Sequence, residues 1–234
     1  MLAAFSLALE WFGAALAPPC CSACDESVPL LTAFCPVCAS TVQRAALHGP
    51  HETAGFVYGG AVARAIGRLK YERRPDLARP LADLLWRAIE PCRAGLSGHV
   101  VVPVPLHASR LAERGFNQSA LVARPLARRL GAPFWARALV RAKDTARQAN
   151  LDREARDANV ARAFVVPDPQ RMRGRSVLLV DDVRTTGATL NACAAVLRAA
   201  GAAKVGWAAV AHVPSAQEGS QAPSWSQEYN LPQP

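Results

Sequence analysis

Two adjacent carboxylates follow a run of aliphatic residues in the segment VLLVDDVRTTGAT, which spans residues 177–189. The run VLLV has the length and composition of a buried strand, and Asp181 and Asp182 come directly after it. Because two ionised side chains are costly to bury, we expect both at the edge of the core, within reach of a ligand. Such a pair is suited to sugar hydroxyls or to a hydrated magnesium ion.

A bend rich in threonine follows the carboxylates and leads into a predicted helix at ATLNACAAVLRAAGA, which Gly201 closes. The first N–H groups of a helix have no intrahelical partners and, together with the helix dipole, favour an anion. Gly187 and Ala188 leave room for an anion to approach the backbone. Hydroxyl donors flank them at Thr185, Thr186 and Thr189. The bend is therefore a predicted phosphate site, and a ribose 5-phosphate unit would satisfy the bend and the carboxylates together.

A strand that ends in Asp-Asp is also typical of nucleotide-driven motors, in which it is the Walker B element. That alternative requires a glycine-rich loop ending in Gly-Lys-Ser/Thr, and the sequence contains neither a Gly-Lys pair nor G-x-G-x-x-G. A purely structural strand, turn and helix would not need two exposed acids and three threonines. The sugar-phosphate interpretation is therefore preferred.

Four cysteines near the start of the chain have the spacing of a metal site. Cys21 and Cys24 form one C-x2-C pair, and ten residues later Cys35 and Cys38 form another. Tetrahedral zinc takes four soft ligands of this kind, and four thiolates leave no open position, so a structural zinc ion is predicted. Free thiols or an iron–sulfur cluster are the alternatives, and Cys20 could exchange with Cys21.

The elements that must position these groups alternate between strands and helices. Strands are predicted at GFVYGG, HVVVPVP, AFVVP, SVLLVDDV and KVGWAAVAHV, and the helix after the second of them ends at Gly131. This order predicts an α/β fold with a parallel sheet covered on both faces. Ligands of such sheets bind beyond the carboxyl ends of the strands, which is where the paired acids lie.

The chain divides into four predicted parts. Residues 1–19 form an amphipathic N-terminal helix, residues 20–50 the zinc module, residues 55–213 the α/β domain, and residues 214–234 a polar, disordered tail. The opening segment has no basic residues before its apolar run and carries Glu10, so it does not match a secretory signal. No apolar run is long enough to span a membrane, and a cytoplasmic location is expected.

The net charge of +9 comes from 27 basic residues, of which only three are lysines. This balance favours a polyanionic partner such as nucleic acid or a phosphate-rich ligand. A compositional bias of the source genome toward arginine explains it equally well.

The segment from Leu178 to Leu190 resembles the phosphoribosyl-pyrophosphate (PRPP) motif of type I phosphoribosyltransferases. Three further stretches resemble the ComF family, a competence-associated subgroup of these proteins. They are VYGGAVARAIGRLKY, VVPVPLHASRLAERGFNQSALVARPLA and LVRAKDTARQANLDREARDANVARAF. With the cysteine pairs, the resemblance extends from Pro18 to about Val213.

The resemblance implies a parallel-sheet, type I phosphoribosyltransferase-like domain with a small N-terminal zinc-binding module. It implies transfer of the phosphoribosyl group from PRPP, with magnesium, to an unidentified nitrogen nucleophile, and a link to DNA uptake. Asp181 and Asp182 would hold the ribose hydroxyls. The alternative is a non-catalytic protein of natural transformation that senses PRPP or a nucleotide, or that binds DNA or the DNA-uptake machinery.

The resemblance also implies residues for the pyrophosphate. Val104 and Pro105 belong to a Pro-Val-Pro loop that presents backbone N–H groups to pyrophosphate, and Arg110 and Arg114 follow with forked donors. A solvated helix face is the alternative for the two arginines.

Lys143 and Arg147 occupy the place of a mobile loop that closes over the substrate, where they would neutralise the departing pyrophosphate. A solvated linker explains that stretch as well. Lys70, beside Tyr71, would either reach the ligand or lie along the surface of a buried tyrosine. Arg184, inside the motif, is expected to point to solvent rather than to a phosphate.

Overall fold

The structure of the protein is a computed structural model, which describes residues 19–45, 51–142 and 163–214. The N-terminal half of the described chain contains α2 (Pro36–Ala39), β1 (Glu52–Val57), α3 (Gly60–Tyr71), η1 (Pro75–Leu77), α4 (Ala78–Ile89), η2 (Glu90–Leu96) and β2 (His99–Pro103). The C-terminal half contains α5 (Ala108–Arg114), α6 (Gln118–Leu130), β3 (Val140–Arg141), β4 (Phe164–Val165), α8 (Pro169–Met172), β5 (Ser176–Arg184), α9 (Ala188–Ala199) and β6 (Lys204–His212). The predicted helix up to residue 18 and the predicted tail from residue 215 lie outside the described residues.

The main sheet has four strands in the order β1-β6-β5-β2, and all neighbouring pairs are parallel. Val177 and Leu179 of β5 belong to one hydrophobic cluster, and Leu178 and Val180 belong to the other. Such alternation places successive side chains on opposite faces, so the sheet has a core on each side. The predicted parallel sheet with two covered faces is confirmed.

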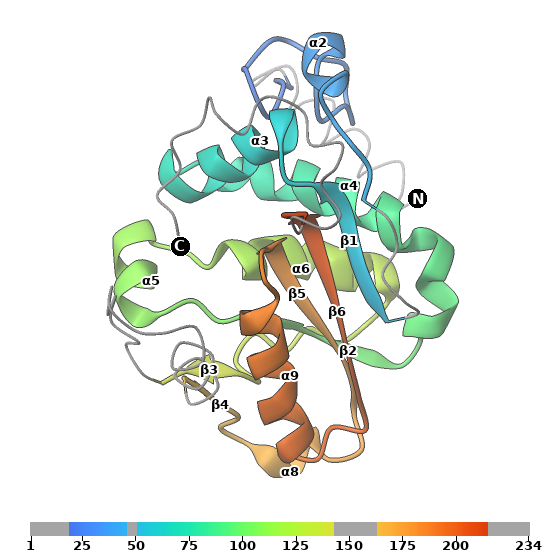
Figure 1. Cartoon of the computed structure of the whole chain (residues 1–234), viewed down its shortest axis with the longest axis vertical. Coiled ribbons are helices and arrows are strands. Elements are labelled where there is room, and N and C mark those ends of the chain that lie inside the picture. Colours follow the sequence, from blue (N-terminus) through green and yellow to red (C-terminus); the bar gives the residue numbers. More distant parts are fainter. Residues whose placement is uncertain (1–18, 46–50, 143–162, 215–234) are drawn as a thin grey trace, which may run out of the picture.

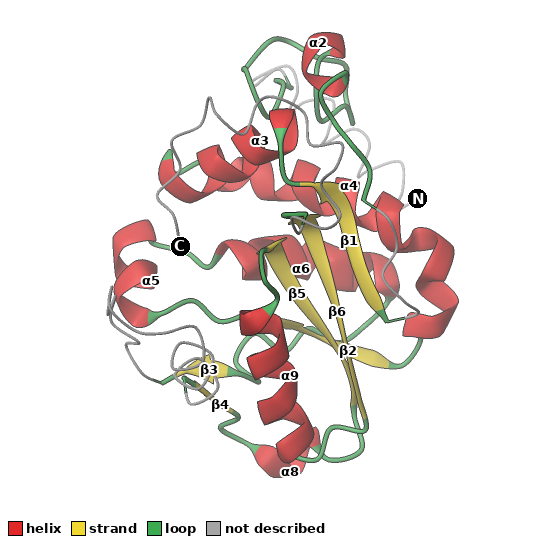
Figure 2. Ribbon diagram, viewed as in Figure 1, coloured by secondary structure: helices red, strands yellow, loops and turns green. Residues whose placement is uncertain are grey.

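Helices cover the two faces unequally. α3, α4 and α6 pack on the face of the sheet to which Leu178 and Val180 point. α9 packs on the opposite face (Figures 1 and 2). The carboxyl ends of β5 and β6 point toward α3 (Figure 1). The end of the central strand β5 therefore lies between α3 on one side and the start of α9 on the other.

The stretch between β2 and Gly131 forms two helices rather than the single helix predicted. Gly115 takes a positive φ of 82° at the end of α5, and Asn117 begins α6 by accepting hydrogen bonds from the N–H groups of Ser119 and Ala120. Gly131 ends α6 with a φ of 61°, as the sequence predicted.

A second, smaller sheet pairs β3 with β4 in antiparallel fashion. The strand predicted at AFVVP is reduced to Phe164 and Val165, and its partner is Val140–Arg141 instead of the main sheet. Neither β3 nor α8 was predicted, because elements of two and four residues have no measurable periodicity.

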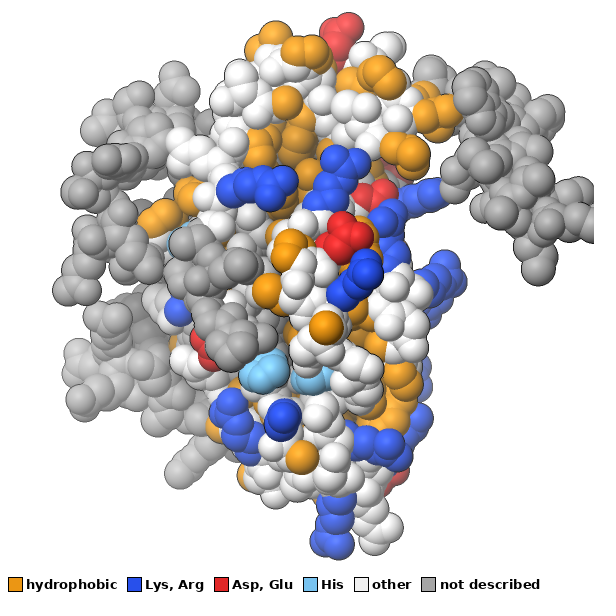
Figure 3. All heavy atoms as spheres, turned by 90° about the vertical axis from the view of Figure 1, so that its right-hand side faces the viewer, with side chains coloured by type: hydrophobic (Ala, Val, Ile, Leu, Met, Phe, Trp, Pro, Cys, Tyr) orange, Lys and Arg blue, Asp and Glu red, His pale blue; other side chains and the backbone are white. Residues whose placement is uncertain are grey.

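The cysteine-rich segment from residue 19 to residue 45 sits at the top of Figure 1, against α3. Exposed apolar side chains gather on it, and orange spheres mark this region in Figure 3; the most exposed are Leu30, Leu31 and Val37. Lysine and arginine side chains are scattered over the face shown in Figure 3, with apolar and acidic side chains between them. None of the described helices has the length and apolar character needed to cross a bilayer.

Candidate functional site

The threonine-rich bend after β5 is open to solvent. Thr185 and Thr186 are exposed, and Gly187 precedes α9 with a φ of 81°, a conformation that favours glycine. The N–H groups of Thr185, Thr186 and Gly187 donate no hydrogen bond to another described residue. One bend amide is engaged, since the N–H of Ala188 donates to the Thr186 hydroxyl at 3.3 Å. The bend therefore keeps backbone donors for an anion, as predicted.

Arg184 lies beside this bend and not in open solvent. Its guanidinium is stacked 5.3 Å from the centre of the Trp207 ring. A Cβ added at Gly187 would come within 3.2 Å of the Arg184 Nε. The expectation that Arg184 points to solvent is wrong, because the indole of Trp207 offers its side chain a stacking surface. A positive charge thus lies next to the predicted phosphate position.

Asp181 lies near the carboxyl end of β5 but is buried, with 8% of its surface exposed. Its Oδ1 accepts hydrogen bonds from the Ser119 hydroxyl at 2.7 Å and from the Asp182 N–H at 2.9 Å. Its Oδ2 accepts none from a described residue. Burial and the charge of Asp182 raise the pKa of Asp181 to about 7. Asp181 is therefore poised between its neutral and ionised forms at neutral pH.

Asp182 is the more deeply buried of the pair, with 3% of its surface exposed. Its Oδ2 forms an ion pair with the ammonium of Lys70 at 2.6 Å. Burial lowers the pKa of Lys70, but the attraction of Asp182 outweighs it, so the pKa is raised overall and the lysine stays charged.

The predicted accessibility of the two carboxylates is therefore wrong, although their place at the end of the central strand is correct. Burial is tolerated because each acid has its own compensating group, the Ser119 hydroxyl for Asp181 and the Lys70 ammonium for Asp182. Contact between Asp182 and a sugar hydroxyl has no support in this arrangement. Asp181 retains a carboxylate oxygen for a ligand.

The Pro-Val-Pro loop after β2 has a structural role. The N–H of Val104 donates to the carbonyl of Val180 at 2.9 Å, and the carbonyl of Val104 accepts from the Asn117 side chain at 3.0 Å. Pro103 and Pro105 have no N–H group. The N–H of Val104 is therefore not available to pyrophosphate, because the loop extends the β2–β5 pairing by one hydrogen bond. A contact of Val104 or Pro105 with pyrophosphate stays a prediction.

The two predicted arginines differ in their surroundings. Arg110 is exposed on α5. Arg114, at the end of α5, donates to the Gln118 side chain and lies 5.5 Å from the centre of the Tyr71 ring. The expectation of a buried Tyr71 with Lys70 along its surface is wrong. Tyr71 is 69% exposed, whereas the Lys70 side chain is only 19% exposed. Lys143 and Arg147 lie outside the described residues.

Sequence reasoning undervalued Lys70 and missed Ser119. Both neighbours of the acids come from helices distant in sequence, and nothing in the local pattern pairs them with β5. The only sequence signal for their proximity to the acids was their place at helix ends. Ser119 lies in the first turn of α6, and Lys70 lies in the last turn of α3.

The four predicted metal ligands are brought together. The sulfur atoms of Cys21, Cys24, Cys35 and Cys38 all lie within 4.8 Å of one another, and those of Cys24 and Cys35 are 3.7 Å apart. A tetrahedral site with Zn–S bonds of about 2.3 Å has sulfurs about 3.8 Å apart. The four cysteines are thus positioned to bind a metal ion, and the cluster closes without Cys20.

The cysteine segment is fastened to α3 by charged side chains. Arg68 of α3 forms ion pairs with Asp25 and with Glu72, and it donates to the carbonyl of Ser22 at 3.3 Å. Arg74 also pairs with Asp25, at 3.1 Å. The helix that carries Lys70 to the acids is therefore held from its outer side by the metal-binding segment.

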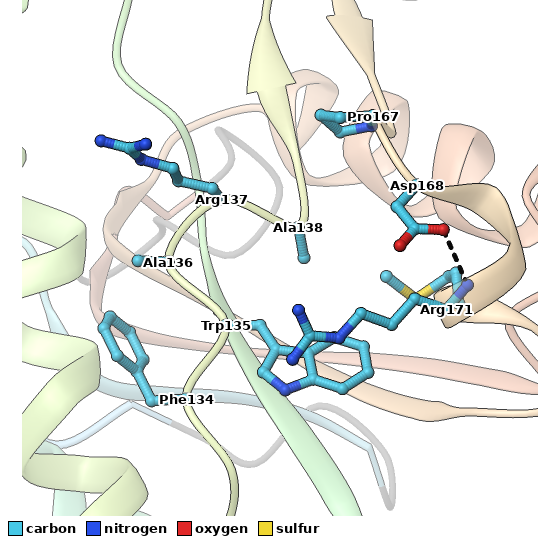
Figure 4. Close-up of a pocket in the computed structure, with 9 residues that line it drawn as sticks. Phe134, Trp135, Ala136, Arg137, Ala138, Pro167, Asp168 and Arg171 are labelled. Atoms are coloured by element: carbon cyan, nitrogen blue, oxygen red, sulfur yellow. Dashed lines mark hydrogen bonds between the residues drawn. The ribbon is translucent and has the colours of Figure 1, made fainter.

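A pocket of about 340 Å³ lies elsewhere, between residues 134–138 and residues 167–172 (Figure 4). Arg171 stacks 4.1 Å from the centre of the Trp135 ring, and Asp168 accepts the N–H of Arg171 at 3.0 Å. The pocket is next to α8, which precedes the amino end of β5. It contains none of the residues of the phosphate bend or the acid pair.

Comparisons with known proteins agree with this architecture. Residues 117–229 match the family described as the phosphoribosyl transferase domain. DNA utilization protein YhgH of Salmonella typhimurium is 32% identical over 198 residues, which cover 79% of this chain and 86% of that protein. Competence protein F of Haemophilus influenzae is 30% identical over 199 residues, with the same coverage of both chains.

Among solved structures, glutamine PRPP amidotransferase from Bacillus subtilis, complexed with ADP and GMP, aligns with 59% of this chain and 26% of its own. The sequence identity is 22% and the TM-score is 0.38. A likeness of that size has no bearing on function.

Proposed function

Because this chain belongs to the ComF family and carries a phosphoribosyltransferase-type domain, we propose that it binds PRPP with magnesium and transfers the phosphoribosyl group to a nitrogen nucleophile. The phosphate on C5 of the sugar occupies the bend formed by Thr185, Thr186, Gly187, Ala188 and Thr189. The sugar lies over the end of β5, where Asp181 accepts a hydroxyl hydrogen bond.

The observation that carries this proposal is the open bend. Its free N–H groups stand at the start of α9, where the helix dipole favours an anion, and Arg184 adds a positive charge beside Gly187. The bend also follows the carboxyl end of a central parallel strand, which is the usual ligand position in an open α/β sheet.

The proposed reaction is a displacement at the anomeric carbon. The C1–O bond to pyrophosphate breaks, and the leaving group takes the electron pair. The nitrogen nucleophile forms the new C1–N bond and releases a proton to solvent. Positioning and charge stabilisation would supply most of the rate enhancement. Magnesium bound with PRPP would neutralise charge on the pyrophosphate, and Asp181, whose Oδ2 accepts no hydrogen bond from a described residue, would be the acid available to hold it.

We further propose that the metal held by Cys21, Cys24, Cys35 and Cys38 is a structural zinc ion. The sulfur spacing matches zinc, and four thiolates leave no ligand position for catalysis.

The experiment that tests the proposed function is calorimetric titration with PRPP and magnesium, on the unaltered protein and on Ala188→Asp. An acidic residue at the first position of α9 suits the helix dipole, so the fold is retained. The same carboxylate repels a bound phosphate, and we expect PRPP affinity to fall roughly 100-fold or more.

Gln170→Glu adds the same charge at the start of α8 and serves as the matched control, with unchanged affinity. If the unaltered protein does not bind PRPP, the proposed function fails.

The alternative is a binding protein without transferase activity, linked to DNA. The names of the relatives and the net charge of +9 favour this link. PRPP binding without pyrophosphate release across a panel of bases and amines would support the alternative. DNA affinity that falls steeply with added salt would support contacts between the protein and phosphates.

A further inference from the structure

The pocket between residues 134–138 and residues 167–172 has the form of a ligand site, and the proposed function does not use it (Figure 4). Its volume of about 340 Å³ lies in the range of small-ligand pockets. The pocket is near the amino end of β5, whereas the phosphate bend follows the carboxyl end of this nine-residue strand. Such a strand is roughly 26 Å long, so a single small ligand does not reach both places.

The wall of the pocket that carries Trp135 is fixed to the edge strand β2 of the main sheet. The N–H of Trp135 donates to the carbonyl of Val101 at 3.0 Å, and the N–H of Val101 donates to the carbonyl of Pro133 at 2.9 Å. On the side of α8 the wall includes Met172, which has 1% of its surface exposed. The pocket is therefore built on hydrogen-bonded backbone and a buried side chain, without the help of a ligand.

A stacked pair of side chains forms one surface of the pocket. The Arg171 guanidinium lies 4.1 Å from the centre of the Trp135 ring (Figure 4). A guanidinium is planar, so the indole covers one of its faces and a second aromatic ring can stack on the other. Arg171 is exposed, which makes that second face accessible. The pocket therefore favours a planar aromatic group.

Positive charge surrounds this aromatic surface. Arg137 extends outward from the rim of the pocket in Figure 4, and Arg175 lies 5.9 Å from the centre of the Trp135 ring. With Arg171 they are three exposed guanidiniums, and among the described residues none of them forms an ion pair with an acid. A phosphate group suits such a rim, because a guanidinium binds two of its oxygens with parallel hydrogen bonds.

Asp168 supplies a hydrogen-bond acceptor among these cations. One of its carboxylate oxygens accepts the N–H of Arg171 at 3.0 Å, and the other is turned toward the pocket (Figure 4). A carboxylate in this position accepts a hydrogen bond from an amino group and repels a carbonyl oxygen. It therefore discriminates between bases that differ in one exocyclic group.

We propose that this pocket binds a free nucleoside monophosphate as a second ligand. The base stacks on Arg171, its amino group donates to Asp168, and the phosphate pairs with Arg137. The volume suits one nucleotide. This inference does not rest on the proposed function, because no residue of the phosphate bend or of the acid pair takes part in the pocket.

Calorimetric titration with CMP and with UMP tests the role of Asp168. Cytosine carries an amino group on C4, where uracil has a carbonyl oxygen, so we expect the unaltered protein to bind CMP about 10-fold more tightly. In Asp168→Asn this preference should shrink to within about threefold, because an asparagine side chain offers both a donor and an acceptor. Asparagine also serves as a helix N-cap, so α8 is retained.

Two arginine variants test the other contacts. Arg171→Met removes the stacking surface and should weaken CMP roughly 10-fold or more. Arg137→Met should weaken CMP by a similar factor and leave cytidine, which has no phosphate, within about threefold. Arg173→Met, at an exposed arginine outside the pocket, is the matched control for loss of one positive charge and should leave CMP affinity unchanged.

Ala188→Asp separates the pocket from the PRPP position, because it blocks the phosphate bend and does not touch the pocket. CMP affinity should be unchanged in this variant. If CMP binding is lost in Ala188→Asp and retained in Arg171→Met, the nucleotide occupies the PRPP position and the proposal is overturned.

The proposal is also overturned if the unaltered protein does not bind CMP. This holds even if a single-stranded oligonucleotide binds and loses affinity in Arg171→Met, since the occupant is then a nucleic acid and not a free nucleotide. Either of these two results leaves the proposed function standing, because that function depends on PRPP binding at the bend.

Discussion

Two adjacent aspartates are accommodated inside this protein because their neighbours differ. Asp182 faces a cation, and Asp181 accepts hydrogen bonds from a hydroxyl and a backbone N–H. The pair therefore need not carry two full negative charges. Asp182 is paired with the Lys70 ammonium, and Asp181 changes its protonation near neutral pH.

The raised pKa of Asp181 predicts a pH dependence of stability. In the unfolded chain this carboxyl ionises near its ordinary pKa, and in the folded protein it ionises near about 7. Between about pH 4 and pH 7 the folded state binds more protons, so its contribution to stability falls as pH rises and is constant above that range.

Asp181→Asn should therefore be more stable than the unaltered protein at pH 8, by roughly 2 to 4 kcal/mol, and this advantage should vanish toward pH 4. The asparagine oxygen still accepts the hydrogen bond from Ser119. Urea unfolding at a series of pH values measures the difference. A constant difference across the series would contradict the raised pKa.

At the scale of elements, α3 connects the cysteine segment to the acid pair. Arg68 and Lys70 lie in the same last turns of the helix, and they face Asp25 and Asp182 respectively. The orientation that brings Lys70 to Asp182 is therefore fixed from both sides.

Arg68→Met tests this connection, because it keeps an apolar stem of similar length and removes both ion pairs and the hydrogen bond to Ser22. We expect a loss of about 2 to 3 kcal/mol in the free energy of unfolding, since Arg68 is nearly buried while its acidic partners are half exposed.

Guanidinium unfolding gives the measurement for Arg68→Met. Arg87→Met, at an exposed arginine of α4, serves as the matched control and should change the unfolding free energy by less than about 0.5 kcal/mol. A similar small change in Arg68→Met would mean that the helix is held by its apolar face alone.

At the scale of the whole molecule, the cysteine segment and the domain share one hydrophobic core. Cys21, Cys35 and Cys38 belong to the same buried cluster as Ile66 and Leu69 of α3 and Val180 of β5. We therefore expect a change at these cysteines to disturb the packing on the face of the sheet that α3 covers.

We expect one zinc ion per chain by elemental analysis, and Cys38→Ser should lose it and lower the melting temperature. Structural zinc contributes directly to folding stability, so a strong chelator should have the same effect on the unaltered protein. Cys92→Ser, at a cysteine outside the cluster, should retain both metal and melting temperature. Full metal content in Cys38→Ser would contradict the assignment of the four ligands.

The sequence by itself determined where the main strands lie along the chain, the helix that follows β5, the open bend and the four clustered cysteines. These depend on patterns within a few residues of one another. An aliphatic run, a Gly-containing turn after it and a C-x2-C pair each keep their physical meaning without knowledge of distant parts of the chain.

The tertiary structure alone decided what surrounds the acids. The burial of Asp181 and Asp182, the engaged N–H of Val104, the stacking of Arg184 on Trp207 and the pairing of β3 with β4 all depend on residues far apart in the sequence. Whether a charge can be buried depends on the group that packing brings to it. Here that group is Lys70, delivered by a helix which the cysteine segment holds in place.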